Sequence, residues 1–298
     1  MSGVNTTAQI SALLETYIIN ARATNEVGPL MRRLMWEVPL PKGKGTSVNV
    51  PKFGTFTAYQ FTRGIRIDQA QQITVTNTQI TPISIAVHFV LDEFAQDTAR
   101  EDVLAHLGKR AGEAINRFED RDCLLLLDGL SRSVGSGGTA KVGHLMAAYA
   151  ILVGGGSAGT DETAEPPFHV VLHPFAYHTI AEDLAGLSNG GQVTSSTNVI
   201  ASGMQLRDEV LQKYLVKQLA GMNVYSTANL LPSGGTIRGG VFHSDAFIYV
   251  PFKDLTTKQQ EDIKLQGWDV VSTKIYGRGE FNDNFGVELN LAAAAPSS

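Results

Sequence analysis

The sequence predicts an α+β protein, in which a strand-forming region precedes one long helix and a mixed region follows it. Residues 45–90 show the alternation of apolar and polar side chains typical of β-strands, most clearly at residues 83–89. Residues 92–128 have apolar residues at the three- and four-residue spacing of an amphipathic helix. The rest of the chain alternates helical and strand patterns and closes with two further strands.

Length and composition are those of a folded protein. The 298 residues allow about two domains, and 43% hydrophobic with 18% charged residues exclude a disordered or collagen-like chain. The single cysteine, Cys123, cannot form an intrachain disulfide. No apolar run approaches the ~18 residues of a membrane span, and the N-terminus lacks the basic region of a secretory signal peptide, so we expect no membrane partner.

Charge is unevenly distributed along the chain. The net charge of −5 argues against a protein whose main task is to bind nucleic acid. Residues 1–66 carry eight basic and three acidic side chains, a net +5, so the remaining 232 residues carry −10. Residues 92–128 hold ten acidic and five basic side chains, which we interpret as a solvated or partner-facing surface of the long helix.

The first 41 residues combine a short helix with an extended arm. Residues 8–22 have the spacing of an amphipathic helix that Thr6 or Thr7 can cap. Three prolines in residues 28–41 exclude a long helix and favour an extended arm, which needs another surface to lie on. The apolar stripe of the predicted helix comprises Ile10, Leu13, Leu14, Tyr17, Ile18 and Ala21.

Residues 45–80 are expected to form a long two-stranded excursion. Apolar alternation marks Val48 and Val50 on the way out and Ile73 and Val75 on the way back. The stretch between them is polar, contains glycine and is dotted with aromatic residues. An isolated hairpin is at best marginally stable in water, so this one must fold back on its own domain or lie on another subunit.

The helix predicted over residues 92–128 is unusually long. If residues 98–128 are all helical, it measures about 45 Å at ~1.5 Å per residue. We expect Gly129 to end this helix in the left-handed conformation that glycine favours there. Residues 131–141 are rich in glycine and serine and are expected to form a loop.

The later elements follow from the same patterns. Helices are predicted at residues 141–153, 174–186 and 205–220, and strands at 168–173, 222–226, 240–250, 270–278 and 286–291, the last two as a pair around a polar turn. Glycine-rich loops separate them at residues 154–160, 186–203 and 232–240, and we expect residues 154–165 and 186–203 to be the most mobile parts outside the arm.

Two glycine motifs suggest chemistry that their surroundings exclude. Residues 154–159 fit G-x-G-x-x-G, but an acidic segment with two prolines follows and cannot open the helix that a dinucleotide site requires. Residues 186–190 fit G-x-S-x-G around Ser188, but a helix precedes the serine and a polar loop follows, the reverse of a nucleophile elbow. We expect a loop in both places.

Three histidines, His169, His173 and His178, form a local cluster that we interpret as ordinary strand and helix residues. On a strand, His169 and His173 lie about 13 Å apart at ~3.3 Å per residue, too far to share a metal ion. We therefore predict no catalytic, cofactor-binding or metal-binding residues and no cofactor. A hydrolase that uses Ser188 or the histidine cluster is kept as the alternative from another functional class.

The order of these parts resembles the major capsid protein of tailed bacteriophages, which has the Hong Kong 97-type fold. The resemblance covers nearly the whole chain as layout and pattern. It rests on the strand that runs into the long helix, on the Asp-Gly end of that helix, on one late strand and on the closing strands, at residues 81–97, 116–130, 222–230 and 270–291.

The resemblance implies a division of the chain into named parts. Residues 1–44 would be the N-terminal arm and residues 45–80 the extended loop. Residues 81–135 and 251–298 would form the peripheral domain, with the long helix as its spine. Residues 136–250 would form the axial domain, whose loops meet at the five-fold and six-fold centres.

The resemblance also implies a function without enzymatic activity. The chain would self-assemble into pentamers and hexamers of an icosahedral head that encloses viral DNA, in a virion assembled in the host cytoplasm. Its partners would be itself, the packaged DNA at the inner face, and portal, scaffolding and cement proteins. An encapsulin-like nanocompartment shell shares the fold and is the near alternative.

Some members of the capsid family crosslink their subunits through a lysine of the extended loop. Lys52 lies in that region, but the sequence places neither a partner residue nor an acid beside it, so no crosslink is inferred from the resemblance.

The charge asymmetry suggests how subunits meet. We expect the basic hairpin of one subunit to lie across the acidic spine helix of its neighbour, which would steer docking and set register. The arm and the hairpin expose about 80 residues with no core of their own, so the isolated monomer is expected to be unstable. The residues assigned to this contact are Lys52, Arg63 and Arg66 on the hairpin and Asp97, Glu101, Asp102 and Glu113 on the spine.

Overall fold

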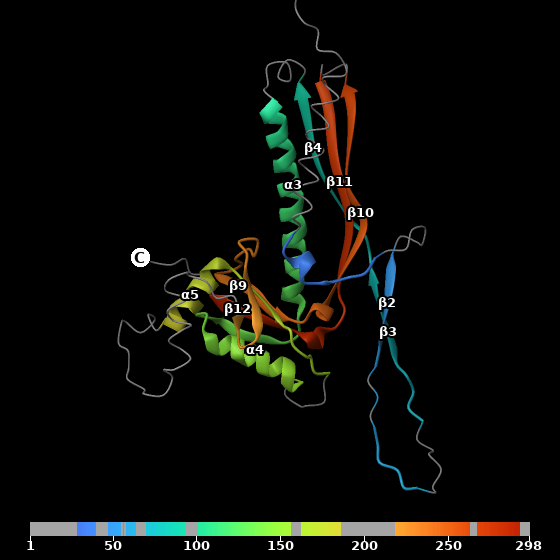
Figure 1. The fold of residues 1–298 in the computed structure, drawn as a ribbon, viewed down its shortest axis with the longest axis vertical. Coiled ribbons are helices and arrows are strands. Elements are labelled where there is room, and N and C mark those ends of the chain that lie inside the picture. Colours follow the sequence, from blue (N-terminus) through green and yellow to red (C-terminus); the bar gives the residue numbers. More distant parts are fainter. Residues whose placement is uncertain are drawn as a thin grey trace, which may run out of the picture.

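A computed structural model describes residues 29–39, 47–54, 56, 58–63, 70–92, 101–155, 162–185, 218–262 and 267–292 of the chain. Figure 1 shows a long sheet with one helix running along it, a second sheet carrying two shorter helices, and a narrow hairpin that projects away from both. The α+β prediction is confirmed.

The long sheet is built mainly from strands far apart in the sequence. Its order is β1 (Trp36–Glu37), β10 (Phe247–Asp262), β11 (Gly267–Glu280) and β4 (Ile83–Asp92). Strands β10, β11 and β4 are antiparallel, with Val270 of β11 opposite Phe89 of β4. The strand predicted at residues 83–89 is confirmed and continues to Asp92, because β11 supplies backbone partners along its whole length.

Helix α3 (Glu101–Leu124) lies along this sheet (Figure 1). Its 24 residues span about 36 Å, and its buried side, with Ala111, Ile115 and Cys123, shares a core with Val270 and Tyr276 of β11. The predicted bounds 92–128 are wrong at both ends, because Asp92 belongs to β4 and the α-helix stops at Leu124. Residues 93–100 lie outside the described part.

The end of the long helix tightens into a 3-10 turn, η2 (Leu125–Gly129). Leu127 and Leu130 are both buried, and the tighter turn brings both into the core. Gly129 lies inside this turn and Leu130 after it is extended, so the prediction that Gly129 ends the helix in the left-handed conformation is wrong.

The second sheet has six strands in the order β5 (Ser133–Gly138), β12 (Gly286–Ala292), β9 (Thr236–Phe242), β6 (His169–Leu172), β8 (Met222–Ser226) and β7 (Gln218–Leu219). Helices α4 (Val142–Gly154) and α5 (Pro174–Ala185) share one core with Val170 and Leu172, whereas Val171 between them belongs to the core that includes η2. The sheet is therefore covered on both faces, as the period of two requires.

Most elements predicted for this region are confirmed, and four differ. The predicted loop 131–141 contains the edge strand β5, in which Gly135 (φ +105°) passes so close to Asn290 that a Cβ would lie 2.5 Å from its carbonyl oxygen. The end of the helix predicted at 205–220 is instead strand β7, and residues 205–217 lie outside the described part.

The other two differences concern the closing strands. The strand predicted at 240–250 is divided into β9 and β10 by the 3-10 turn η3 (Ser244–Ala246). Strand β9 begins at Thr236, so the loop predicted at 232–240 is wrong over its second half, because β12 pairs with these residues. The predicted pair 270–278 and 286–291 is not a pair, because β11 and β12 belong to different sheets. Between them Asn282 accepts a hydrogen bond from the Asn284 backbone N–H and caps the turn η4 (Asp283–Phe285), which redirects the chain.

The hairpin consists of β2 (Val48–Phe53) and β3 (Val75–Ile80), paired in antiparallel register. Its base is anchored, since Val50 and Ile80 form a small core with Ile248 and Val250 of β10. Gly277 of β11 makes room for this contact, because a Cβ there would lie 2.7 Å from Ile80 Cγ2. Beyond this base the hairpin extends away from the sheets (Figure 1).

The described part of the arm lies on its own chain. A 3-10 turn, η1 (Met31–Arg33), places Met31 in the core, and β1 adds a short parallel pairing to β10. The arm therefore lies on its own chain, and its described part begins with a 3-10 turn rather than an extended segment. The premise that arm and hairpin have no core contacts, from which we expected an unstable monomer, is wrong for Met31, Val50 and Ile80. Residues 8–22 and the Gly-rich segment 186–203 fall outside the described residues, as do residues 156–161 of the other predicted mobile loop.

Candidate assembly surfaces

The hairpin carries aromatic side chains that nothing in the described chain covers. Phe53, Phe56 and Phe61 are 61%, 64% and 57% exposed, although phenylalanine is normally buried. Tyr59, Ile73 and Val75 are exposed beside them. Several exposed apolar side chains gathered on one element mark a place where another molecule can bind.

The basic residues assigned to the hairpin have different surroundings. Lys52 Nζ donates a hydrogen bond to Asn282 Oδ1 at 2.8 Å and lies 3.3 Å from Glu162 Oε2, all within one chain. Arg63 is exposed near the tip, and Arg66 lies outside the described residues. Lys52 thus helps to fix the base of the hairpin, whereas Arg63 is available at its tip.

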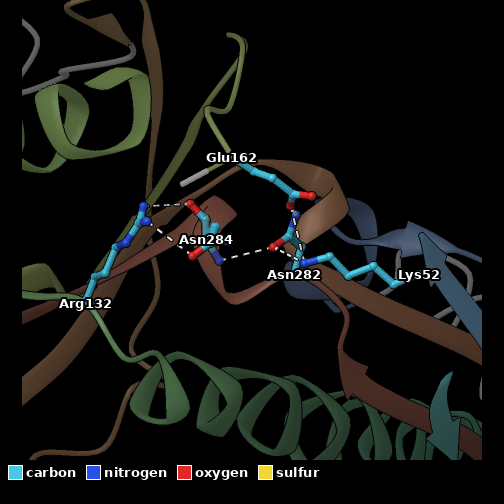
Figure 2. A network of polar contacts seen from close by, with 5 residues as sticks. All are labelled: Lys52, Arg132, Glu162, Asn282 and Asn284. Carbon is cyan, nitrogen blue, oxygen red and sulfur yellow. Dashed lines mark hydrogen bonds and ion pairs between the residues drawn. The ribbon is translucent and has the colours of Figure 1, made fainter. Parts of the chain in front are cut away.

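Figure 2 shows that Lys52 belongs to a polar network joining four parts of the fold. Asn282 is almost fully buried, and its Nδ2 donates to Glu162 Oε2 at 2.7 Å. Arg132 donates to the backbone oxygen of Asn284 at 3.0 Å. The network connects the hairpin base, the segments before β5 and before β6, and the turn between β11 and β12. The sequence marked this turn as polar but gave no sign of which distant side chains meet there.

The acidic residues at the end of α3 do not face solvent or a partner. Glu119 is fully buried and accepts hydrogen bonds from Tyr249 Oη, at 2.6 Å, and from Lys274 Nζ. Burial and the nearby Glu119 carboxylate raise the pKa of Tyr249 well above its ordinary value, so this hydroxyl stays a donor. The lysine in the middle of the apolar strand β11 is the one sequence signal that could have revealed this pair.

Asp120 and Asp122 are also bound within the chain. Asp120 Oδ1 accepts the backbone N–H of Met31 at 2.9 Å, and its Oδ2 accepts Asn229 Nδ2 at 2.7 Å. Asp122 accepts two hydrogen bonds from the Arg278 guanidinium, at 2.6 and 2.7 Å. For these acids the interpretation as a solvated or partner-facing surface is wrong: they attach the helix to β10, β11 and the arm.

The acids assigned to the subunit contact lie elsewhere on the helix. Glu101 and Asp102 belong to the first turn of α3, and Asp97 lies outside the described residues. Glu113 is half-buried and lies 3.5 Å from Arg110 of the same helix. Among the described side chains, Glu113 pairs with Arg110 and not with Arg63, and the contact between subunits stays a prediction.

The positions considered for chemistry have ordinary structural roles where they are described. Half-buried His169 has its Nε2 3.2 Å from Ser244 Oγ, and partial burial lowers the pKa of this histidine. His173 accepts the Phe175 backbone N–H, and His178 lies 3.5 Å from Glu182. Gly155 ends α4 in the left-handed conformation, so a helix finishes where a dinucleotide site needs one to begin. Ser188 lies outside the described residues.

The described residues contain no group of three or more histidine, cysteine or acidic side chains that could hold a metal ion. Among the same residues, no helix has both the length and the apolar character needed to cross a membrane.

Two cavities adjoin the C-terminal half of α3, and Phe118 lines both of them. One has a volume of about 470 Å³ and lies between the end of α3 and the loop after β8. The other, about 340 Å³, lies between α3 and β4. We call the two together the spine groove; its lining includes Val87, Ala114, Phe118, Leu125, Leu230 and Leu231.

No protein-family model matches the chain, and no curated protein matches it. Solved structures do match. The capsid of Ralstonia phage GP4 gives a TM-score of 0.65 at 12% identity, over 89% of this chain and 88% of that chain. A structure from Mycobacterium phage Che8 gives 0.64 at 13% identity, over 83% and 85%. A virus-like particle from Pyrococcus furiosus gives 0.56 at 12% identity, over 92% and 98%.

These matches span most of each chain. At identities this low the likeness is one of fold. The chain has the fold of tailed-bacteriophage major capsid proteins, which confirms the fold that the sequence resemblance implied.

Proposed function

We propose that this chain is the major shell subunit of a phage-type capsid, a structural protein rather than an enzyme. The observation that carries the proposal is the hairpin, which is anchored at its base by Val50 and Ile80 and carries exposed phenylalanines beyond it. Exposure of such a surface to water is energetically unfavourable in an isolated chain, whereas its burial stabilises a chain that binds copies of itself. The capsids among the structural neighbours support the same reading.

The proposal includes the arrangement that the resemblance implied. Subunits assemble as pentamers and hexamers into an icosahedral head around DNA, in a virion formed in the host cytoplasm. Residues 1–44 act as the arm and 45–80 as the extended loop; 81–135 with 251–298 form the peripheral domain and 136–250 the axial domain. Portal, scaffolding and cement proteins are the further partners.

The contact between subunits combines apolar and charged groups. The aromatic side chains of the hairpin supply the buried anchors on the neighbouring subunit, and Arg63 and Arg66 steer the approach toward its acidic spine. The acids available for this role lie in the first half of the helix, because Glu119, Asp120 and Asp122 are bound within their own chain. They are Asp97, Glu101, Asp102 and Glu113.

A nanocompartment shell is the second candidate, favoured by the likeness to the virus-like particle from Pyrococcus furiosus. Electron microscopy of the purified protein tests the shared claim: closed shells or hexameric capsomers support it, and a small globular oligomer contradicts it. Nuclease-resistant DNA inside shells isolated from infected cells supports the capsid, and a protein cargo without DNA supports the compartment.

A further inference from the structure

The spine groove is an apolar surface that the described chain leaves open. Phe118, Leu125 and Leu231 are 54%, 63% and 61% exposed along it. Exposed apolar surface in such a cluster is unfavourable in water and marks a binding site.

Four charged residues line the groove, and three of them are already paired. Asp122 is bound by Arg278, and Arg238 forms an ion pair with Asp128, which leaves Arg121 as the fourth. The groove therefore chiefly lacks apolar contact, and its occupant should present an apolar face.

The arm meets the body of the protein at the edge of this groove. The Met31 backbone N–H is held by Asp120, whose other oxygen accepts Asn229, and Asn229 itself lines the groove. Eight residues lie between Arg22, the end of segment 8–22, and Met31, and the nine steps between them reach about 30 Å at ~3.4 Å each. The segment can therefore reach any part of the groove.

Segment 8–22 has the complementary chemistry. The sequence gives it one apolar stripe, from Ile10 to Ala21, and a helix of this length is marginal in water unless its stripe is covered. The exposed apolar side chains of the hairpin lie on an element that projects away from α3 (Figure 1). We propose that residues 8–22 form a helix whose apolar stripe occupies the spine groove of the same chain.

This contact is intramolecular, so it does not depend on shell formation. The arm then covers α3, the loop after β8 and the edge of β4 together. It can be tested on dissociated subunits, whether or not the proposed capsid function is correct.

Disulfide trapping in the full chain tests the proposal. Leu14→Cys or Tyr17→Cys on the stripe is combined with Leu125→Cys or Leu231→Cys in the groove, since a disulfide forms only when the two Cα atoms come within about 7 Å. The native Cys123 is buried, and its burial raises the pKa of its thiol, so it does not interfere. The matched control pairs Leu125→Cys with Ala12→Cys, which lies on the opposite side of the predicted helix.

We expect an intrachain disulfide, identified by peptide mass, in most of the molecules of at least one stripe pair and in few of the control. Equal yields in stripe and control pairs, or no disulfide in any pair, would overturn the proposal. An interchain disulfide would overturn it too, because the occupant would then be the arm of a second copy.

Hydrogen exchange gives a readout that needs no cysteine. The double variant Leu125→Asp/Leu231→Asp changes two exposed positions in the groove and should weaken docking of the arm helix. The backbone amides of residues 8–22 should then exchange at least about tenfold faster than in the parent chain. Met146→Asp, an exposed apolar position on α4, should leave their exchange unchanged. Unchanged exchange in the double variant contradicts the docking.

Discussion

At the scale of single residues, buried charge decides how the long helix is attached. Lys274 and Glu119 are almost fully enclosed and face each other across the space between β11 and α3. Burying two charges has a large desolvation cost, which their attraction and the Tyr249 hydrogen bond offset. The pair therefore fixes the position of the helix more than it adds stability, and loss of either partner should be severe.

Removing the lysine tests this assignment. Lys274→Met leaves the Glu119 carboxylate buried without its cation, which should cost about 3–5 kcal/mol of unfolding free energy in urea denaturation of dissociated subunits. The control is Arg110→Ala, which removes an exposed pair with Glu113 and should cost less than about 1 kcal/mol. Similar costs for the two variants would show that the buried pair has no special role.

A second residue-scale prediction concerns pH. Burial and the neighbouring Asp283 carboxylate raise the pKa of Glu280 in the folded protein. The stability linked to this group is therefore present below the pKa of the unfolded chain and is lost as pH rises through the folded pKa. Glu280→Gln, which mimics the protonated form, should stabilise the protein at pH 7 and have little effect at pH 4.

Urea midpoints measured from pH 4 to 7 check this dependence. The exposed Glu165→Gln serves as the control and should follow the parent protein across the range. An effect of Glu280→Gln that stays constant with pH would contradict the assignment of the raised pKa.

At the scale of elements, periodic apolar patterns predicted most of the helices and strands correctly. Strands with polar or glycine-rich sequences were not predicted. The alternation in β4 and the stripe of α3 identified both elements. Strand β10 continues to Asp262 through a polar stretch because β11 supplies its hydrogen bonds, and β5 forms because β12 pairs with it. Such strands form because neighbouring strands supply their backbone hydrogen bonds, and the local sequence carries no information about those neighbours.

The sequence predicted the hairpin surface but not the distribution of charge on the spine helix, because that distribution depends on residues far along the chain. Composition identified the hairpin as basic and aromatic, and the structure leaves its described aromatic side chains exposed. Net charge suggested that the whole spine is an acidic surface, but it could not show that Glu119, Asp120 and Asp122 find partners in segments far along the chain.

The hairpin gives the element-scale prediction. Phe53→Ser/Phe56→Ser/Phe61→Ser changes only exposed side chains, so the folded subunit should keep its circular dichroism and melting temperature. Assembly should weaken by about a hundredfold or more in subunit affinity, since buried aromatic anchors carry about 2 kcal/mol or more each at interfaces. Light scattering against protein concentration measures this change.

Gln60→Ser/Thr62→Ser, two exposed polar positions on the same segment, is the matched control and should assemble normally. If the triple phenylalanine variant assembles at the concentration of the parent protein, the hairpin is not the principal contact.

At the scale of the whole molecule, we expect charge asymmetry to affect the proposed assembly more than the folding of the chain. The basic first 66 residues and the acidic remainder favour head-to-tail association of copies. Arg63→Glu/Arg66→Glu should slow assembly and make it less tolerant of salt, because screening acts over about 10 Å at 0.1 M.

Lys253→Glu/Lys258→Glu makes the same change in net charge on β10 and serves as the control. Stopped-flow scattering between low and moderate salt should separate the two variants. Identical rates would mean that total charge, rather than the position of the hairpin arginines, sets the rate.

Cryo-electron microscopy of the purified, assembled protein is the decisive experiment on the proposed shell contact. We expect closed shells in which the Phe53, Phe56 and Phe61 side chains of each hairpin are buried on a neighbouring subunit, with a carboxylate of that neighbour within about 6 Å of Arg63 or Arg66. Small globular oligomers, or shells whose hairpins remain in solvent, would contradict it.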